Sequence, residues 1–129
     1  MAEPLFLLDS NILIYVLEGK GSSLRDRVEN WAPGQVVTSA ICAAEVLRGI
    51  RADDAKRMER AQRLFVLIEP LPFAREAALA CQRIPFRRGS FDRLIAAHAL
   101  SLDLVLITSN EADFADVPGL RVENWTLPL

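Results

Sequence analysis

Short apolar runs alternate along this chain with longer segments in which apolar residues recur every three or four positions. The short runs lie at residues 5–8, 36–38 and 104–108 and are typical of buried strands. A last short strand is predicted at residues 119–122, and residues 65–68 fit either a strand or the end of a helix. The longer segments predict helices at residues 10–17, 22–31, 39–48, 53–64, 73–83 and 90–102.

This alternation of strands and helices favours one architecture. Short apolar strands connected by helices are expected to form a mainly parallel sheet covered on both faces, which is a three-layer α/β/α sandwich. The 129 residues have the length of one domain and contain no repeat, low-complexity tract or linker, so residues 1–129 are expected to form a single domain. In such sheets the functional site lies beyond the carboxyl ends of the strands.

Three acidic residues occur at the edges of, or within, apolar segments. Asp9 directly follows the first strand, Glu45 lies inside an apolar helix, and Asp92 lies in the first turn of another helix. A carboxylate costs several kcal/mol to desolvate unless a partner compensates its charge. Capping a helix would explain Asp9 or Asp92 alone, but it does not explain all three together. Since Mg²⁺ takes oxygen ligands, the three acids predict a shared cation acting on phosphate esters.

Composition and net charge limit the functional classes to which this protein can belong. The chain is 51% hydrophobic and 25% charged, which indicates a globular protein. A net charge of −2 gives no overall basic field, so a purely electrostatic nucleic-acid binder is disfavoured, whereas an enzyme that uses metal ions and local arginines is not. The adjacent Arg87 and Arg88 precede Asp92 in a loop and are candidates for steering a phosphate group.

The remaining chemistry-bearing residues are predicted to be structural. Cys42 and Cys81 lie in apolar helical segments and fit buried thiols in a reducing compartment. His98 is the sole histidine, and it points roughly 120° away from Asp92 around a shared helix, so it is expected to be packed. A ribonuclease mechanism with two histidines is therefore excluded. No signal peptide or membrane span is apparent, so a cytoplasmic protein is expected.

Several motifs in order along the chain resemble a known family. They are Leu7-Leu8-Asp9-Ser10-Asn11-Ile12-Leu13-Ile14-Tyr15, Ser39-Ala40-Ile41, Ala44-Glu45-Val46-Leu47-Arg48-Gly49, Phe91-Asp92-Arg93-Leu94-Ile95-Ala96-Ala97-His98-Ala99, Leu106-Ile107-Thr108-Ser109-Asn110 with Asp113-Phe114, and Val117-Pro118-Gly119-Leu120 with Val122-Glu123-Asn124-Trp125. Together they resemble the PIN domain, and most closely the VapC-type ribonuclease toxins of bacterial toxin–antitoxin pairs. The resemblance implies a PIN-like fold, a Mg²⁺- or Mn²⁺-dependent endoribonuclease, a homodimer, and inhibition by a small antitoxin protein.

The resemblance also implies roles for individual residues. Asp9, Glu45 and Asp92 match the acidic metal site of the family. At the fourth position the family has Asp or Asn, and here Asn110 supplies an oxygen without a charge. Asp113, one helical turn further on, is the alternative fourth residue, acting through a water molecule. The expected result is one tightly held divalent ion and a weakly held second one.

Two polar residues beside Asp9 complete the expected site. Ser10 stands where many relatives carry Thr, and its hydroxyl can keep the same polar contact. Asn11 is expected to orient the loop through side-chain bonds to the backbone. Both are candidate substrate contacts, together with Arg87 and Arg88.

The residues themselves suggest how the reaction would proceed. A divalent cation lowers the pKa of its bound water and clamps a phosphate oxygen. Asp9 and Asp92 are the expected primary ligands, while Glu45 either ligates through water or acts as the general base.

Other functions fit less well. A phosphatase of the haloacid dehalogenase type needs a second acid where Asn11 stands, and a downstream lysine that neither Lys20 nor Lys56 provides. A non-catalytic partner-binding module and a DNA-directed nuclease stay as alternatives. RNA is preferred over DNA because the chain lacks the long insertions that would thread a DNA strand.

Overall fold

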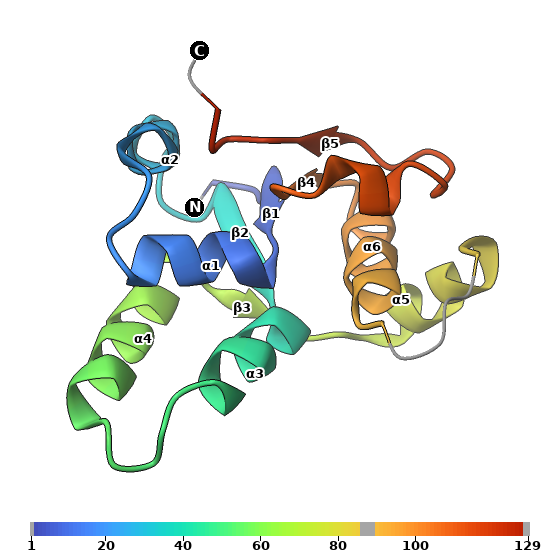
Figure 1. Ribbon diagram of the computed structural model, residues 1–129. Coiled ribbons are helices and arrows are strands. Elements are labelled where there is room, and N and C mark those ends of the chain that lie inside the picture. Colours follow the sequence, from blue (N-terminus) through green and yellow to red (C-terminus); the bar gives the residue numbers. More distant parts are fainter. Residues whose placement is uncertain (1, 86–89, 128–129) are drawn as a thin grey trace.

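The computed structural model describes residues 2–85 and 90–127. Its centre is a parallel five-stranded sheet with strand order β3-β2-β1-β4-β5 (Figure 1). The strands are β1 (Phe6–Leu8), β2 (Val36–Ser39), β3 (Pro70–Leu71), β4 (Val105–Ile107) and β5 (Val122–Glu123). The register pairs Leu7 of β1 with Val37 of β2 and with Leu106 of β4. The predicted parallel sheet and its three main strands are therefore confirmed.

The helices lie where the apolar periodicity predicted them, with small shifts at their ends. They are α1 (Ser10–Leu17), α2 (Ser22–Glu29), α3 (Ala40–Arg48), α4 (Ala55–Leu67), α5 (Arg75–Ala80) and α6 (Asp92–Ser101), with short 3₁₀ helices η1 (Cys81–Arg83) and η2 (Glu111–Phe114). Of the ambiguous residues 65–68, the first three complete α4 and Ile68 is its C-cap, and the strand follows at Pro70. The last strand was predicted too early, because Gly119 has a φ of +79° and forms a turn before β5.

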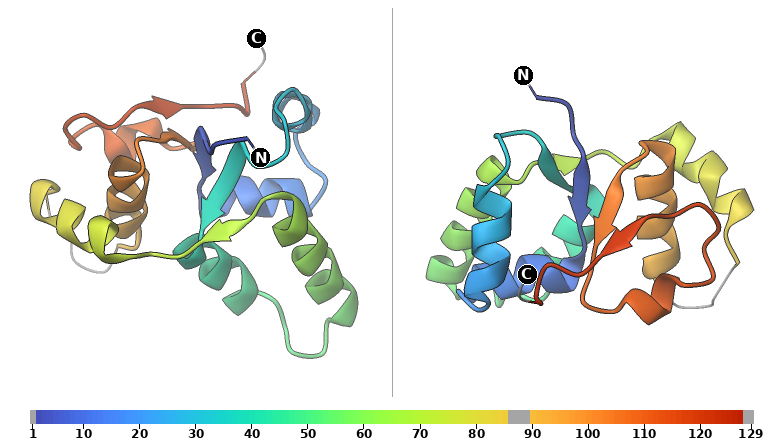
Figure 2. Two further views of the ribbon diagram at one scale, coloured as in Figure 1. Left: turned by 180° about the vertical axis from the view of Figure 1, so that it is seen from behind. Right: turned by 90° about the horizontal axis from the view of Figure 1, so that it is seen from above.

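Helices cover both faces of the sheet, as the sandwich prediction requires. Helices α1 and α4 lie to one side and α5 and α6 to the other (Figures 1 and 2). Helix α3 contacts α1, α4 and α6. The chain leaves β1 toward β2 but returns from β3 to β4 on the opposite side of β1. The carboxyl ends of β1 and β4 therefore flank the point where the strand order reverses, which is the usual place for a site in this architecture.

The core explains why the central strands are apolar throughout. Every residue of β1 and β4 is buried, because both faces of a helix-covered parallel sheet are removed from water. Leu7 and Leu106 are fully buried next to each other in the sheet, and Ile12 and Ile95 pack from helices. This rigid centre fixes the positions of the residues that follow each strand.

Side chains of polar residues cap the first turns of several helices. Asp9 Oδ1 accepts a hydrogen bond from the Ile12 amide at 3.0 Å, and Ser39 Oγ accepts one from the Ile41 amide at 3.0 Å. Asp54 caps α4 in the same way. Each cap satisfies an amide that has no partner inside its helix.

Two simpler expectations concern cysteines and membranes. Cys42 and Cys81 are both free thiols, and burial raises the pKa of Cys42 to about 12, so it stays protonated. Within residues 2–85 and 90–127, no helix combines the length and the apolar character needed to cross a bilayer.

Candidate active site at the carboxyl edge of the sheet

Asp9 is placed by the end of β1 and by the start of α1. Its amide donates to the Ile107 carbonyl of β4 at 3.0 Å, so its backbone is tied to the neighbouring strand. The side chain is only 5% exposed. Burial raises the pKa of Asp9 to about 6; hydrogen bonds from Thr108 and Ile12 work in the opposite direction. A carboxylate this deeply buried is poised to gain from a cation.

Glu45 reaches the same edge from the middle of α3 and is half-buried. Its Oε1 accepts a hydrogen bond of 2.5 Å from Ser10 Oγ. The residue directly after Asp9 therefore holds the second acid, and this bond joins α1 to α3. The negative charge of Glu45 also contributes to the raised pKa of Asp9. The expected polar contact of Ser10 is present in the structure.

Asp92 begins α6, and its amide donates to Ser90 Oγ at 3.1 Å. Burial raises the pKa of Asp92, and the negative charges of Asp113 and Glu45 raise it further, whereas Arg93 lowers it. Asp92 likewise raises the pKa of Asp9. The three acids predicted from sequence therefore repel one another across one edge of the sheet.

The two candidates for the fourth position differ in their surroundings. Asp113 lies in η2, and its charge raises the pKa of Asp92, so the structure brings this carboxylate into the acidic group. Asn110 is exposed and contributes main-chain contacts: its amide donates to Thr108 Oγ1 at 3.1 Å, and its carbonyl accepts from the Asp113 amide at 3.0 Å.

The donor chemistry of this edge suits a hard cation, and the spacing of the acids limits how it would be held. Among the described residues, no three His, Cys, Asp or Glu side chains are gathered tightly enough to hold one ion directly. Mg²⁺ is commonly bound by one or two carboxylates and keeps several waters, so close gathering of three ligands is not required. Asp9 and Asp92, with Glu45 and Asp113 acting on them through their charges, are the side chains that could hold such an ion.

Three predicted site residues differ from expectation or lie outside the described ranges. Asn11 was expected to bond the loop backbone, but its side chain is exposed and makes no hydrogen bond to any residue in the described ranges. The reason is that α1 begins at Ser10, so Asp9 makes the capping bond and Asn11 lies on the outer surface of the first turn. Arg87 and Arg88 lie outside the described residues.

His98 is packed, as predicted. Its Nδ1 lies 2.9 Å from Ser39 Oγ, and its ring meets the Phe73 ring edge-on at a centroid distance of 5.5 Å. Burial lowers the pKa of His98, which favours the neutral ring. Since Ser39 caps α3, this histidine supports the helix that carries Glu45.

Sequence reasoning missed an ion pair beside the acids. Arg93 is only 6% exposed, and its Nη1 donates to Asp116 Oδ1 at 3.0 Å. A signal was available, because an arginine inside the apolar segment after Asp92 must either leave the core or find a buried partner.

Comparisons with known proteins agree with this architecture. The PIN domain family matches residues 6–120, and the chain therefore belongs to the PIN-domain family. It is similar to the tRNA(fMet)-specific endonuclease VapC of Shigella flexneri, with 32% identity covering 94% of this chain and 98% of that protein. It is also 31% identical to ribonuclease VapC1 of Haemophilus influenzae strain R2866, covering 95% of this chain and 98% of the relative.

Solved structures give the same result. The structure of VapBC-1 from nontypeable Haemophilus influenzae matches with a TM-score of 0.81 at 28% identity, covering 95% of this chain and 99% of that one. A DNA-bound VapBC from Salmonella typhimurium matches with a TM-score of 0.84 at 27% identity, covering 95% and 98%. The relatives confirm the predicted family and fold.

Proposed function

We propose that this protein is a metal-dependent endoribonuclease toxin, which hydrolyses RNA phosphodiester bonds and is neutralised by a cognate antitoxin. The observation that carries the proposal is the group of mutually repelling carboxylates, in which Asp9 is buried with its pKa raised to about 6. Acidic residues that served only as helix caps would have no need to lie close together at one edge of the sheet. Membership of the PIN-domain family and similarity to VapC ribonucleases support the same reading.

In the proposed reaction, Asp9 and Asp92 would hold Mg²⁺ or Mn²⁺ at the carboxyl edge of the sheet. Such an ion would supply a water of lowered pKa and would stabilise charge on the phosphate. Glu45, oriented by the 2.5 Å bond from Ser10, would accept a proton from the attacking water or contact the ion through water. Thr108 and the Ile12 amide keep Asp9 in its orientation.

Cleavage of a mixed RNA pool tests the proposal, with initiator tRNA included because relatives are named as tRNA(fMet)-specific endonucleases. Cleavage should require Mg²⁺ or Mn²⁺, should stop with EDTA, and should be lost in Asp92→Asn. Asp26→Asn, which changes an exposed acid in α2, is the matched control and should retain activity. Faster cleavage of DNA would favour the alternative of a DNA-directed nuclease. A folded protein that cleaves neither substrate would favour a non-catalytic binding module.

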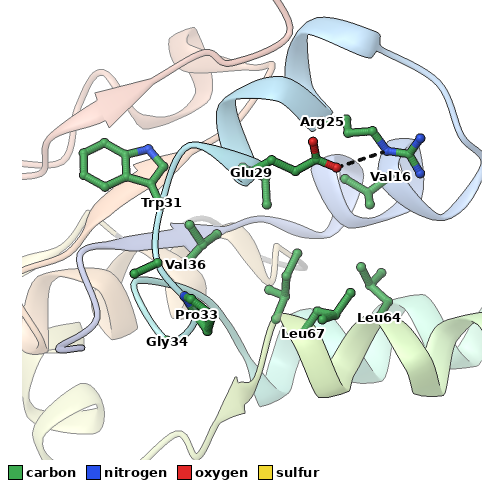
Figure 3. A pocket seen from close by; sticks show the side chains of 12 residues that line it. Val16, Arg25, Glu29, Trp31, Pro33, Gly34, Val36, Leu64 and Leu67 are labelled. Carbon is green, nitrogen blue, oxygen red and sulfur yellow. Dashed lines mark ion pairs between the residues drawn. The ribbon is translucent and has the colours of Figure 1, made fainter. Parts of the chain in front are cut away.

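We infer that the antitoxin binds in an apolar groove beside α2 and α4. Similar chains were solved as VapBC complexes, and one with 28% identity and a TM-score of 0.72 is a toxin–antitoxin complex from Klebsiella pneumoniae. The groove of about 270 Å³ includes Trp31 and Val36 on one side and Leu64 and Leu67 on the other, with the Arg25–Glu29 pair at 3.9 Å at its rim (Figure 3). Such a groove fits the apolar face of a peptide helix.

We further infer that two copies associate in solution. Several large apolar residues outside the groove are exposed, among them Leu79, Phe91 and Leu102. Apolar residues that gather into one exposed patch are commonly covered by a partner. Light scattering at micromolar concentration should give the mass of a dimer, and a stable monomer would contradict this inference.

A further inference from the structure

Arg93 connects three segments of the chain around the acidic group. It lies in the first turn of α6, directly after Asp92, and its side chain is almost completely buried. Nη1 donates to Asp116 Oδ1 at 3.0 Å and to the Pro85 carbonyl at 3.4 Å, while Nη2 donates to the Asp113 carbonyl. One guanidinium therefore ties the start of α6 to the segment that begins with η2.

The η2 segment has a second anchor on its other side. Phe114 is buried in the core, so its ring fixes one end of η2. Arg93 holds the main chain one residue earlier, at Asp113. The Asp113 carboxylate is exposed, yet its charge is felt by Asp92. The place of Asp113 beside the start of α6 thus depends on the backbone that Phe114 and Arg93 hold between them.

We propose that Arg93 is a positioning residue, which fixes Asp113 against Asp92 and thereby sets the geometry of the acidic group for a divalent cation. The inference rests on the proposed function, since it takes the cation to be the metal of the ribonuclease reaction. Burying a guanidinium is costly unless it is paired and hydrogen-bonded, and here the ion pair with Asp116 compensates the charge. Nη1 and Nη2 also hold the backbone carbonyls of Pro85 and Asp113, whereas Nε is buried with no hydrogen-bond partner among the described residues.

The shape of arginine matters for this role. A planar guanidinium with five donors can reach a carboxylate and two carbonyls in fixed directions, whereas a lysine ammonium is a single flexible point charge. Arg93→Lys should therefore keep much of the charge but hold η2 poorly. Arg93→Met removes both the charge and the planar group of hydrogen-bond donors, and it keeps a long apolar side chain.

Calorimetric titration of Mn²⁺ into the protein tests the proposal without relying on catalysis. Arg93→Met and Asp113→Asn should each weaken Mn²⁺ binding by about 10- to 100-fold, the usual effect of removing a group that orients a ligand. Arg93→Lys should lie between Arg93→Met and wild type. Arg121→Met is the matched control, because Arg121 pairs with exposed Asp103 at 3.2 Å before β5, at the opposite end of the sheet. Its Mn²⁺ affinity should equal that of wild type.

The decisive measurement is the double variant Arg93→Met with Asp113→Asn. If Arg93 acts through Asp113, the double variant should bind Mn²⁺ no more weakly than Asp113→Asn alone. Additive losses, or an Arg93→Met protein that melts earlier but binds Mn²⁺ like wild type, would overturn the proposal in favour of a purely structural ion pair. Should Arg93→Met fail to fold, Asp116→Asn releases one anchor and should show a smaller loss with the same dependence on Asp113.

Failure of the ribonuclease proposal would give a different set of Mn²⁺ affinities from failure of the Arg93 proposal alone. If Asp9→Asn and Asp92→Asn also bind Mn²⁺ like wild type, the metal site itself is absent and the ribonuclease proposal fails with it. If those two variants lose the metal while the Arg93 and Asp113 effects are additive, only the positioning role of Arg93 is rejected.

Discussion

The hydroxyl of Ser10 donates a 2.5 Å hydrogen bond to Oε1 of Glu45, joining the first turn of α1 to the middle of α3. The preceding residue, Asp9, caps the same turn through the Ile12 amide. Two acids from distant parts of the chain are therefore oriented by the same helix start. Any change to this turn is expected to affect both the ligand and the proposed general base.

Ser10→Ala should slow RNA cleavage on the order of 10- to 100-fold, because Glu45 loses the bond that orients it. Ser10→Thr keeps the hydroxyl and should stay close to wild type. Ser23→Ala is the matched control, since it removes a serine hydroxyl that donates to the Leu127 carbonyl on the surface. Single-turnover cleavage rates with Mn²⁺ provide the measurement. A wild-type rate for Ser10→Ala would mean that Glu45 does not need this orientation.

Asp9→Asn should abolish cleavage and stabilise the metal-free protein at neutral pH. In wild type, burial raises the folded pKa of Asp9 to about 6 from the ordinary 3.8, so its contribution to stability is present in acid and is lost as pH rises through 6. Asparagine keeps the capping oxygen and cannot ionise. The gain at pH 7.5 should be on the order of 1–3 kcal/mol and should vanish near pH 4.

Urea unfolding in EDTA across this pH range measures the effect of Asp9→Asn. Asp54→Asn is the control, because Asp54 also caps a helix, accepting from the Arg57 amide at 3.1 Å, but lies outside the acidic group. A gain of equal size in both variants would assign it to capping and not to relief of the buried charge. A folded Asp9→Asn protein that still cleaves RNA would contradict the proposed metal site.

The parallel sheet could be predicted from the sequence, and so could the acidic group of Asp9, Glu45 and Asp92 at its edge, because both depend on local signals. A continuous apolar run specifies a strand buried on both faces, and a polar residue at its end must emerge at the sheet edge. Ser10 was identified as a polar contact, but its partner was not, because Glu45 is 35 positions away in the chain. Such a bond is set by how α1 packs on α3.

The sequence did not reveal the Arg93–Asp116 pair for a similar reason. The two residues are 23 positions apart, and each alone is compatible with an exposed surface. The packing of η2 against α6 brings the arginine and Asp116 together. Asn11 was expected to bond the loop backbone, and this prediction was wrong because Asp9 already makes the capping bond. Residue propensity does not specify which of several nearby polar side chains makes such a bond.

Leu67→Asp should weaken antitoxin binding, because it places a charge in the apolar groove. Leu67 is 75% exposed, so the substitution should leave the free energy of unfolding nearly unchanged. Val66→Asp is a matched control, since Val66 is 82% exposed but does not line the groove. Co-purification with the protein encoded by a small adjacent reading frame provides the measurement. Equal retention of the antitoxin by both variants would place its binding site elsewhere.

Asn110→Asp tests which residue fills the fourth position of the acidic group. With a metal bound, an added carboxylate should tighten binding, chiefly of a weakly held second ion, because ligand charge tunes affinity for hard cations. Without metal, the added charge should increase repulsion among Asp9, Glu45 and Asp92 and lower the melting temperature. Titration of Mn²⁺ into wild type and variant gives both affinity and stoichiometry. Equal values would show that Asn110 does not approach the metal. Asp113, whose charge already acts on Asp92, would then be the fourth residue, and Asp113→Asn should weaken binding where Asn110→Asp did nothing.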